Sequence, residues 1–513
     1  MPDNNISSNK RIAKNTLLLY ARMLYSLVIS LFTARVVLNA LGAVDYGIYN
    51  VVGSVVSMFV FLRTAMGNST HRYVAFALGK GDQQQLNKVF STSIIIHFAI
   101  GIAIIVLAET VGLWFLYNKM VIPEERMVAA QWCYHFSVIT CFLSVICVPY
   151  DAEIIAHEKM GVFAFVQMFN STMNLVIAYL LVITNSDRLI LYGLLLLSIQ
   201  VLNRVFYGFY CSRKFEECHF TWMKDMSLIK EMTSFAGWSL IGNMIWVAYT
   251  QGTNILLNMF FGPVVNAARG IAVQVQSVIK GFVTNFQMAV NPQITKTYAA
   301  GELKQMHSLI FSSTKLSFFL LFMFFLPLFI EAEWILEIWL KNVPDHSVAY
   351  LRLSLLIMLF SPLVNPIETS NNATGDIKKF QIVVGCFNIF IVILSYVALK
   401  LGFPPESVFV VQLAISSIVL FVKLLLVRKK INLSIREYVV KVLLRLALVA
   451  LISSVVPLSL FYLLGQTVMN NLLIIVVSVL CVVISAYYVG LSNHERTIIT
   501  EKIRERIKIN KSK

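Results

Sequence analysis

The sequence predicts an all-α polytopic membrane protein with about 14 transmembrane helices. Its 513 residues are 58% hydrophobic and only 13% charged, whereas soluble globular domains carry about 25% charged residues. A helix needs about 20 apolar residues to cross a bilayer, and runs of this kind recur along nearly the whole chain. The runs are continuous rather than alternating, which argues against a transmembrane β-barrel.

Fourteen runs meet these criteria. The first follows Lys10, Arg11 and Lys14 and is too long for the apolar region of a signal peptide, so we expect it to be the first span. The expected spans are residues 16–40, 47–66, 89–116, 128–149, 161–183, 189–210, 234–259, 270–291, 309–330, 350–367, 380–400, 406–427, 442–464 and 471–491.

Basic residues set the expected orientation. With the N-terminus inside, 28 of the 42 lysines and arginines fall in inside segments and six in outside segments. Cytoplasmic loops of membrane proteins carry this excess, so both termini are expected to be cytoplasmic. The same asymmetry explains the net charge of +16, and nucleic acid is therefore not expected as a partner. Within the expected spans, Glu109 is the only acidic residue well away from a boundary.

An internal repeat divides the chain. Residues 41–82 and 261–302 align at a constant offset, and both copies follow a span that starts inside, so the two halves would be related by an axis along the membrane normal. The expected domains are an N-lobe with a cytoplasmic connector (1–225), a C-lobe (226–430), and two added spans with a basic cytoplasmic tail (431–513). Matching positions include Gly42 and Gly262, Thr64 and Thr284, and Gly81-Asp82 and Gly301-Glu302.

Polar side chains recur every three or four residues on the first two spans of each half. This spacing puts them on one helix face, which is typical of a helix lining a wet cavity. The alternative is that they join neighbouring helices by hydrogen bonds. The stripes are Arg22, Ser26, Ser30 and Thr33; Asn50, Ser54, Ser57, Thr64 and Asn68; Asn243, Thr250, Asn254 and Asn258; and Gln276, Lys280, Thr284, Gln287 and Asn291.

Three cations in these stripes or beside them point to an anionic ligand. An Arg or Lys at mid-bilayer costs about 3 kcal/mol and normally faces a cavity. Arg22, Arg63 and Lys280 meet this description, whereas Arg35 near an outer end either lines the cavity or reaches the interface. Arginine binds phosphate through a planar fork of donors, and lysine acts as a point charge. The candidate substrate-binding residues are Arg22, Arg63, Lys280, Gln276, Gln287, Asn254 and Arg35.

No catalytic residue and no metal site is expected. The seven cysteines form no CxxC pair, and the eight histidines form no HxxxH motif or triad-like cluster.

Two long segments resemble polysaccharide flippases of the Wzx type, in the multidrug/oligosaccharidyl-lipid/polysaccharide exporter superfamily. They are TARVVLNALGAVDYGIYNVVGSVV (33–56) and THRYVAFALGKGD (70–82). Residues 121–132, 260–276 and 285–302 are similar to the Bacteroidetes branch, usually described as lipopolysaccharide or capsule biosynthesis membrane proteins. The resemblance covers nearly the whole chain.

The resemblance implies two six-helix bundles that form a V around a central cationic cavity and open alternately inward and outward. It implies a cargo of undecaprenyl-diphosphate-linked oligosaccharide, such as an O-antigen, capsule or exopolysaccharide repeat unit. The cargo would move from the cytoplasmic to the periplasmic leaflet of the bacterial inner membrane. No cofactor is implied; coupling to Na⁺, H⁺ or the membrane potential is left open. Membrane lipids and other polysaccharide assembly proteins are the expected partners besides the cargo.

The related lipid II flippases carry cavity-lining arginines in spans 1, 2 and 8. Arg22 and Arg63 resemble the first two, and Lys280 stands near the third, where it keeps the charge but loses the fork. Asp45 resembles an acidic position of the same proteins, but a solvated loop aspartate is the expectation here.

Two other functions are weighed against a flippase. A cation-coupled multidrug antiporter of the same superfamily needs carboxylates inside the bundle, and Glu109 offers one. A membrane polysaccharide polymerase or ligase would carry a long periplasmic loop with catalytic residues, whereas the longest outer loop here spans only residues 331–348. The protein is therefore expected not to be an enzyme.

Overall fold

The computed structural model describes residues 2–57, 60–119, 122–184, 186–222, 225–261, 263–340, 343–492 and 495–497. Every regular element among these residues is a helix, and none of them forms a strand, so the predicted all-α class is confirmed. Lipid offers no hydrogen-bond partner to the backbone, and a helix satisfies its N–H and C=O groups within one segment.

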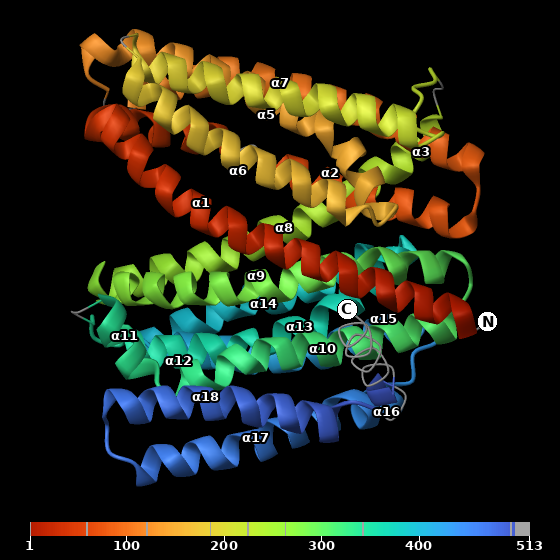
Figure 1. Ribbon diagram of the computed structural model, residues 1–513, viewed down its shortest axis with the longest axis vertical. Coiled ribbons are helices and arrows are strands. Elements are labelled where there is room, and N and C mark those ends of the chain that lie inside the picture. The colour runs from red at the N-terminus through yellow and green to blue at the C-terminus, as the bar shows by residue number, and fades with distance from the viewer. Residues whose placement is uncertain are drawn as a thin grey trace, which may run out of the picture. The chain divides into compact units, whose positions relative to one another are not determined.

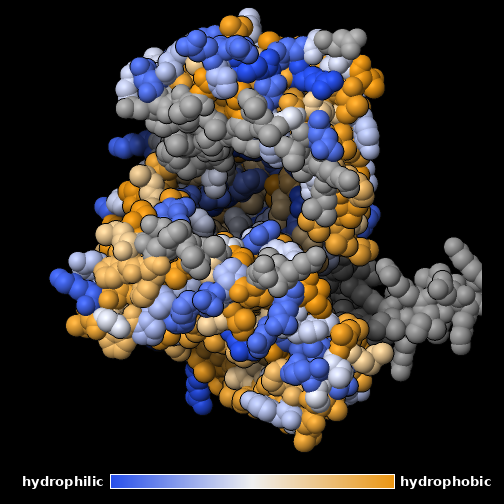
Figure 2. All heavy atoms as spheres, turned by 90° about the vertical axis from the view of Figure 1, so that its left-hand side faces the viewer, coloured by the Kyte–Doolittle hydropathy of each residue, from blue (hydrophilic) through white to orange (hydrophobic). Residues whose placement is uncertain are grey.

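Ten helical segments in the described part of the chain are long and apolar enough to cross a membrane. The four other expected spans, 16–40, 47–66, 234–259 and 270–291, fall on α1 (Pro2–Ser57), α2 (Val60–Lys80), α8 (Met226–Phe261) and α9 (Pro263–Ala299), which carry the polar stripes. Figure 2 looks onto one end of the helices and shows hydrophilic side chains spread over that end and hydrophobic ones along the margins.

The chain forms two compact units, of which the first comprises residues 1–243, 295–301 and 375–378. In this unit α1 packs along α6, and α5 packs against both α3 and α7. Figure 1 shows α5, α6 and α7 side by side. Besides α1, α2 and the first part of α8, its helices are α3 (Gln83–Leu107), α4 (Leu113–Lys119), α5 (Met127–Ala156), α6 (Met160–Ile183) and α7 (Arg188–Lys214), with a π-helical turn at Ala108–Gly112 and a 3₁₀ turn at Glu124–Arg126.

The break between the first two expected spans lies inside α1. Gly42 has φ +76°, a conformation that side chains with a Cβ rarely adopt, and the helix changes direction there before continuing to Ser57. The expected break between the first two spans, residues 41–46, therefore contains the kink, and the described residues of the second span, 47–57 and 60–66, are helical.

The second unit comprises residues 244–294, 302–374 and 379–513. Its central helix α10 packs against α13 and α18, and it carries a ladder of stacked rings from Phe318 through Phe322 and Phe325 to Phe329. In Figure 1, α17 and α18 lie side by side. Besides most of α9, its helices are α10 (Leu303–Ile330), α11 (Ala332–Leu340), α12 (Ser347–Met358), α13 (Phe360–Thr374), α14 (Lys378–Lys400), α15 (Ser407–Arg428), α16 (Ile435–Tyr438), α17 (Leu444–Leu463) and α18 (Val468–Ser485), with π-helical turns at Val439–Leu443 and Ala486–Gly490.

A close approach of two backbones holds the end of α9 against α2 in the first unit. A Cβ added at Gly79 would lie 2.5 Å from the Lys296 carbonyl oxygen and 2.8 Å from the Ala299 Cβ. Because the first of these atoms belongs to the backbone, it cannot move aside as a flexible side chain would. The two helices therefore need a glycine at this position.

We expect Gly79→Ala to destabilise the protein by about 1–3 kcal/mol, the usual cost of overpacking. Gly237→Ala in α8 is the matched control, because no atom lies within 4 Å of its added Cβ, and alanine is the better helix former. Thermal unfolding in detergent measures both. Equal unfolding temperatures for the two variants would contradict the close-approach argument.

Candidate functional site

A pocket of about 210 Å³ that contains both polar and apolar lining lies between α2 and α5 in the first unit. Arg63 is half-buried at its edge, and Thr64 and Asn68 beside it are exposed. A Cβ added at Gly67 would make an ordinary contact with the Val148 side chain at 3.4 Å, so the two helices lie close together at this point. The lining residues are Arg63, Thr64, Gly67, Asn68, His71, Val148 and Asp151.

Arg63 makes no hydrogen bond and no ion pair with any residue that the structure describes. Asp151 lines the same pocket and interacts with it electrostatically. Hydropathy missed this carboxylate, because the expected span ended at residue 149 whereas α5 continues to Ala156. The polar end of a helix that extends beyond its apolar run is the sequence signal that could have identified Asp151.

Two residues of the first stripe, on α1, contact α6. The guanidinium of Arg22 lies over the ring of Phe163 on α6, 5.5 Å from the ring centroid, within the range of a cation–π contact. One turn later the Ser171 hydroxyl donates a hydrogen bond to Ser26 at 2.9 Å. This part of the stripe joins α1 to α6. The side chain of Arg35, a candidate on the same helix, lies outside the described residues.

Lys280 occupies the exposed face of α9 in the second unit. Ser277 and Thr284, one turn before and one turn after, are exposed as well. Lys280 forms neither a hydrogen bond nor an ion pair within the described ranges. It is therefore a cation on a polar helix face that no carboxylate neutralises.

The glutamines of the α9 stripe contact neighbouring helices. Gln276 donates to the Ser354 carbonyl of α12 at 3.4 Å, and Gln287, only 3% exposed, donates to the Ser317 hydroxyl of α10 at 3.3 Å. Asn254 is half-buried on α8. Both glutamines thus form hydrogen bonds between helices, which is the alternative to lining a cavity.

Several other basic side chains in or beside the spans have partners. These pairings are typical of charges held by structure, because burying an unpaired charge is costly. They are Arg126 with Asp45 and Asp187, Lys296 with Glu158, Lys315 with Glu495, Lys423 with Glu368, Arg204 with the Tyr150 hydroxyl, Arg269 with the Thr250 carbonyl, and Arg352 with the Phe329 carbonyl.

Two carboxylates in the spans are engaged as well. Glu109 lies 2.9 Å from the His135 ring, and Glu368 contacts the ammonium of Lys423. The carboxylate on which the antiporter alternative depended therefore already has a neighbour inside the first unit.

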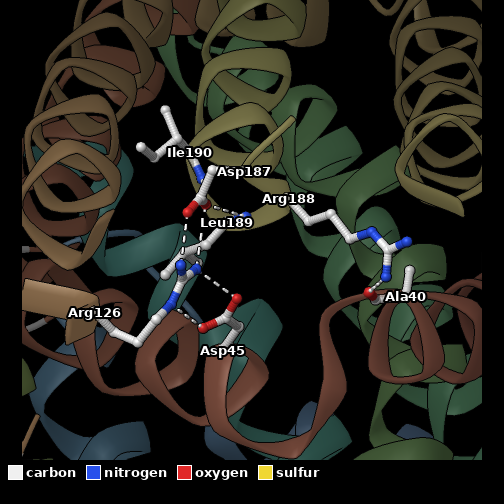
Figure 3. Close-up of polar contacts among 7 residues, drawn as sticks. All are labelled: Ala40, Asp45, Arg126, Asp187, Arg188, Leu189 and Ile190. Atoms are coloured by element: carbon white, nitrogen blue, oxygen red, sulfur yellow. Dashed lines mark hydrogen bonds and ion pairs between the residues drawn. The ribbon is translucent and has the colours of Figure 1, made fainter. Parts of the chain in front are cut away.

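An arginine at one end of the first unit joins three segments. Figure 3 shows Arg126, just before α5, facing Asp45 of α1 and Asp187 at the start of α7. Each contact is a two-bond fork, with shortest distances of 2.6 Å to both carboxylates. Asp45 is 15% exposed, so the expectation of a solvated loop aspartate is wrong. It lies in the helical segment after the Gly42 break, where Arg126 can reach it.

This network also sets the ionisation of Asp187. Burial raises the pKa of the carboxyl, but hydrogen bonds from Arg126 and from the backbone N–H groups of Ile190 and Leu189 outweigh burial, and the pKa lies below its ordinary value. The stabilisation it contributes is present at neutral pH and is lost as pH falls through the lowered pKa.

The helical arrangement is similar to that of solved transporters of the MOP superfamily. An outward-facing multidrug resistance MATE family transporter of that superfamily aligns with a TM-score of 0.71 at 12% identity. A MATE structure in the bent conformation gives 0.72 at 13%, and a MOP superfamily transporter from Pyrococcus furiosus gives 0.68 at 13%. Each alignment covers 83% of this chain and 96% of the other. At these identities the likeness shows the fold alone.

Family models carry the identification further. Residues 12–298 match the model described as polysaccharide biosynthesis protein, and residues 239–397 match MatE. A search of curated proteins found no match. The chain belongs to the polysaccharide biosynthesis protein family, and its fold is similar to that of MATE and MOP superfamily transporters.

We predict that Arg126→Gln lowers thermal stability at pH 7 and that its difference from wild type shrinks as pH falls below about 4, the ordinary pKa of aspartate. The loss should be modest, about 1 kcal/mol for each partly exposed pair. Unfolding temperatures between pH 7 and pH 3 give the comparison. A difference that stays constant over this range would show that Arg126 stabilises the fold by packing alone.

Proposed function

We propose that the protein is a flippase for an undecaprenyl-diphosphate-linked oligosaccharide, moving it from the cytoplasmic to the periplasmic leaflet of the bacterial inner membrane. The observation that carries this is the contrast between two groups of cations. Arg63 and Lys280 have no acidic partner at hydrogen-bond distance in the described part of the chain, whereas Arg126, Lys296, Lys315 and Lys423 do.

Retaining such charges without a hydrogen-bonded carboxylate is favourable when a ligand or water, or for Arg63 the nearby Asp151, offsets the charge. Keeping a cation in a membrane span costs about 3 kcal/mol on insertion scales. The diphosphate of the cargo offers several anionic oxygens, which match the planar fork of Arg63 and the point charge of Lys280. Arg22 belongs to the same proposal, with its guanidinium resting on Phe163. We also propose that four further residues bind the sugar or the diphosphate: Gln276, Gln287, Asn254 and Arg35.

The proposed orientation has both termini in the cytoplasm, as the distribution of basic residues indicates. The lipid tail would stay in the bilayer while the polar head crosses along the polar helix faces of α1, α2, α8 and α9. We propose that transport is coupled to Na⁺, H⁺ or the membrane potential. Transport assays with each of these gradients identify which one drives it. Other polysaccharide assembly proteins are the proposed partners.

Reconstitution tests this function directly. Liposomes carrying an undecaprenyl-diphosphate oligosaccharide on one leaflet should show its appearance on the other when wild type is present. Arg22→Gln, Arg63→Gln and Lys280→Gln should each slow the transfer roughly tenfold, since a charge-assisted hydrogen bond contributes about 1.5–3 kcal/mol.

Lys304→Gln is the matched control, because Lys304 is an exposed basic residue outside the candidate set, and it should transfer at the wild-type rate. If wild type moves the lipid and the three variants match it, the flippase proposal stands and the site assignment fails. If wild type moves no such lipid, the proposed function fails.

One observation favours a second function, a cation-coupled multidrug antiporter. Asp151 shares the Arg63 pocket, and its Oδ1 is buried without a hydrogen-bond partner among the described residues. A carboxylate in such a position could exchange a cationic drug for Na⁺ or H⁺.

Under the flippase proposal, wild type in liposomes should not exchange a cationic dye for Na⁺ or H⁺, and Asp151→Asn should not change dye distribution. Dye exchange by wild type that Asp151→Asn abolishes would establish the antiporter function instead. Glu109→Gln is the control for a carboxylate that already contacts a histidine.

A further inference from the structure

A cluster of one histidine and two glutamates lies where α5 ends in the first unit. Glu153 is in the last turn of α5, His157 follows the helix directly, and Glu217 belongs to the segment between α7 and α8. One ligand-competent atom from each residue lies within 4.8 Å of the others. The three side chains thus converge from two segments about 60 residues apart in sequence.

Glu153 is the residue that needs explaining. It is 0% exposed, and neither carboxylate oxygen has a hydrogen-bond partner in the part of the chain that the structure describes. The nitrogen Nε2 of His157 lies 3.8 Å from Oε2, which is longer than a hydrogen bond. A buried carboxylate without hydrogen bonds is strongly unfavourable unless a proton or a metal cation neutralises it.

The other two side chains are held in place by neighbours. The His157 ring stacks on Phe215, with centroids 4.2 Å apart and planes at 15°, and its Nε2 lies 2.5 Å from Glu217 Oε1. The second oxygen of Glu217 accepts a hydrogen bond from Gln83 at 2.9 Å. Supporting bonds of this kind orient metal ligands and fix their geometry.

The backbone around Glu217 is anchored as well. The Asn87 amide of α3 donates to the carbonyls of Glu217 and His219, both at 2.8 Å, and Asn87 in turn accepts from the Thr221 hydroxyl. The segment after α7 is therefore positioned by α3 without help from the cluster.

We propose that Glu153, His157 and Glu217 bind a divalent transition-metal ion, with Zn²⁺ as the best match. Imidazole nitrogen and carboxylate oxygens suit Zn²⁺, whereas Mg²⁺ and Ca²⁺ take six or more oxygens. With bonds of about 2.0–2.2 Å, ligand atoms around tetrahedral zinc lie about 3.3 Å apart. The observed 2.5 and 3.8 Å separations reach this value by small side-chain rotations.

Water would supply the fourth ligand, and the metal would join the end of α5 to the segment that leads to α8. The proposal is independent of the proposed transport function, because no candidate substrate-binding residue belongs to the cluster.

The test uses the full-length protein in detergent, stripped with a chelator and then dialysed against micromolar ZnCl₂ with millimolar Mg²⁺ present. Wild type should retain about one zinc per chain and unfold at a higher temperature than the stripped protein. Glu153→Gln keeps the shape of the side chain but removes a ligand, and it should lose both the zinc and the temperature shift.

Glu216→Gln is the matched control, since Glu216 is the exposed neighbour of Glu217, and it should behave as wild type. Glu217→Gln and His157→Gln provide the same comparison should Glu153→Gln fail to fold. Retention of zinc by all three cluster variants, or its displacement from wild type by millimolar Mg²⁺, would overturn the proposal. So would a wild type that retains no zinc.

Discussion

A charge inside a membrane-spanning bundle must find a partner, because hydrocarbon offers neither water nor counter-ions. Several basic side chains in the described residues satisfy this constraint with a carboxylate, a hydroxyl or a backbone carbonyl, as Lys296 does with Glu158 and Arg352 with Phe329. Many of these pairs also join segments distant in sequence, so they hold the helices in place. Arg63 and Lys280 depart from the pattern, and the proposed function rests on that departure.

The class and most helices could be predicted from the sequence, because bilayer thickness and backbone hydrogen bonding leave few alternatives. Hydropathy located all ten apolar segments. It also placed a break between the first two spans at residues 41–46, where the positive φ of Gly42 kinks α1. It missed helix ends that extend beyond the apolar run, such as the last turn of α5, because hydropathy detects only the apolar part of a helix.

The site was harder to predict than the fold. A stripe at helical spacing identifies one face of a helix but not the neighbour that this face contacts. Gln287 and Lys280 lie on the same stripe of α9, yet Gln287 is buried against α10 and Lys280 is exposed. Asp45 was read as solvated because its partner Arg126 lies 81 residues away. The cluster at the end of α5 gave one local signal, Glu153 and His157 four residues apart on one helix face, but Glu217 joins them only through the fold.

The central claim is that unpaired cations of this chain recognise a lipid diphosphate. Equilibrium binding of a short-chain prenyl diphosphate to the purified protein, with the corresponding prenyl alcohol as comparison, tests it without requiring transport. The account predicts that the diphosphate binds much more tightly than the alcohol, that added salt weakens its binding, and that an Arg63→Gln, Lys280→Gln double variant loses the difference between the two ligands. Equal binding of diphosphate and alcohol to wild type, insensitive to salt, would contradict it.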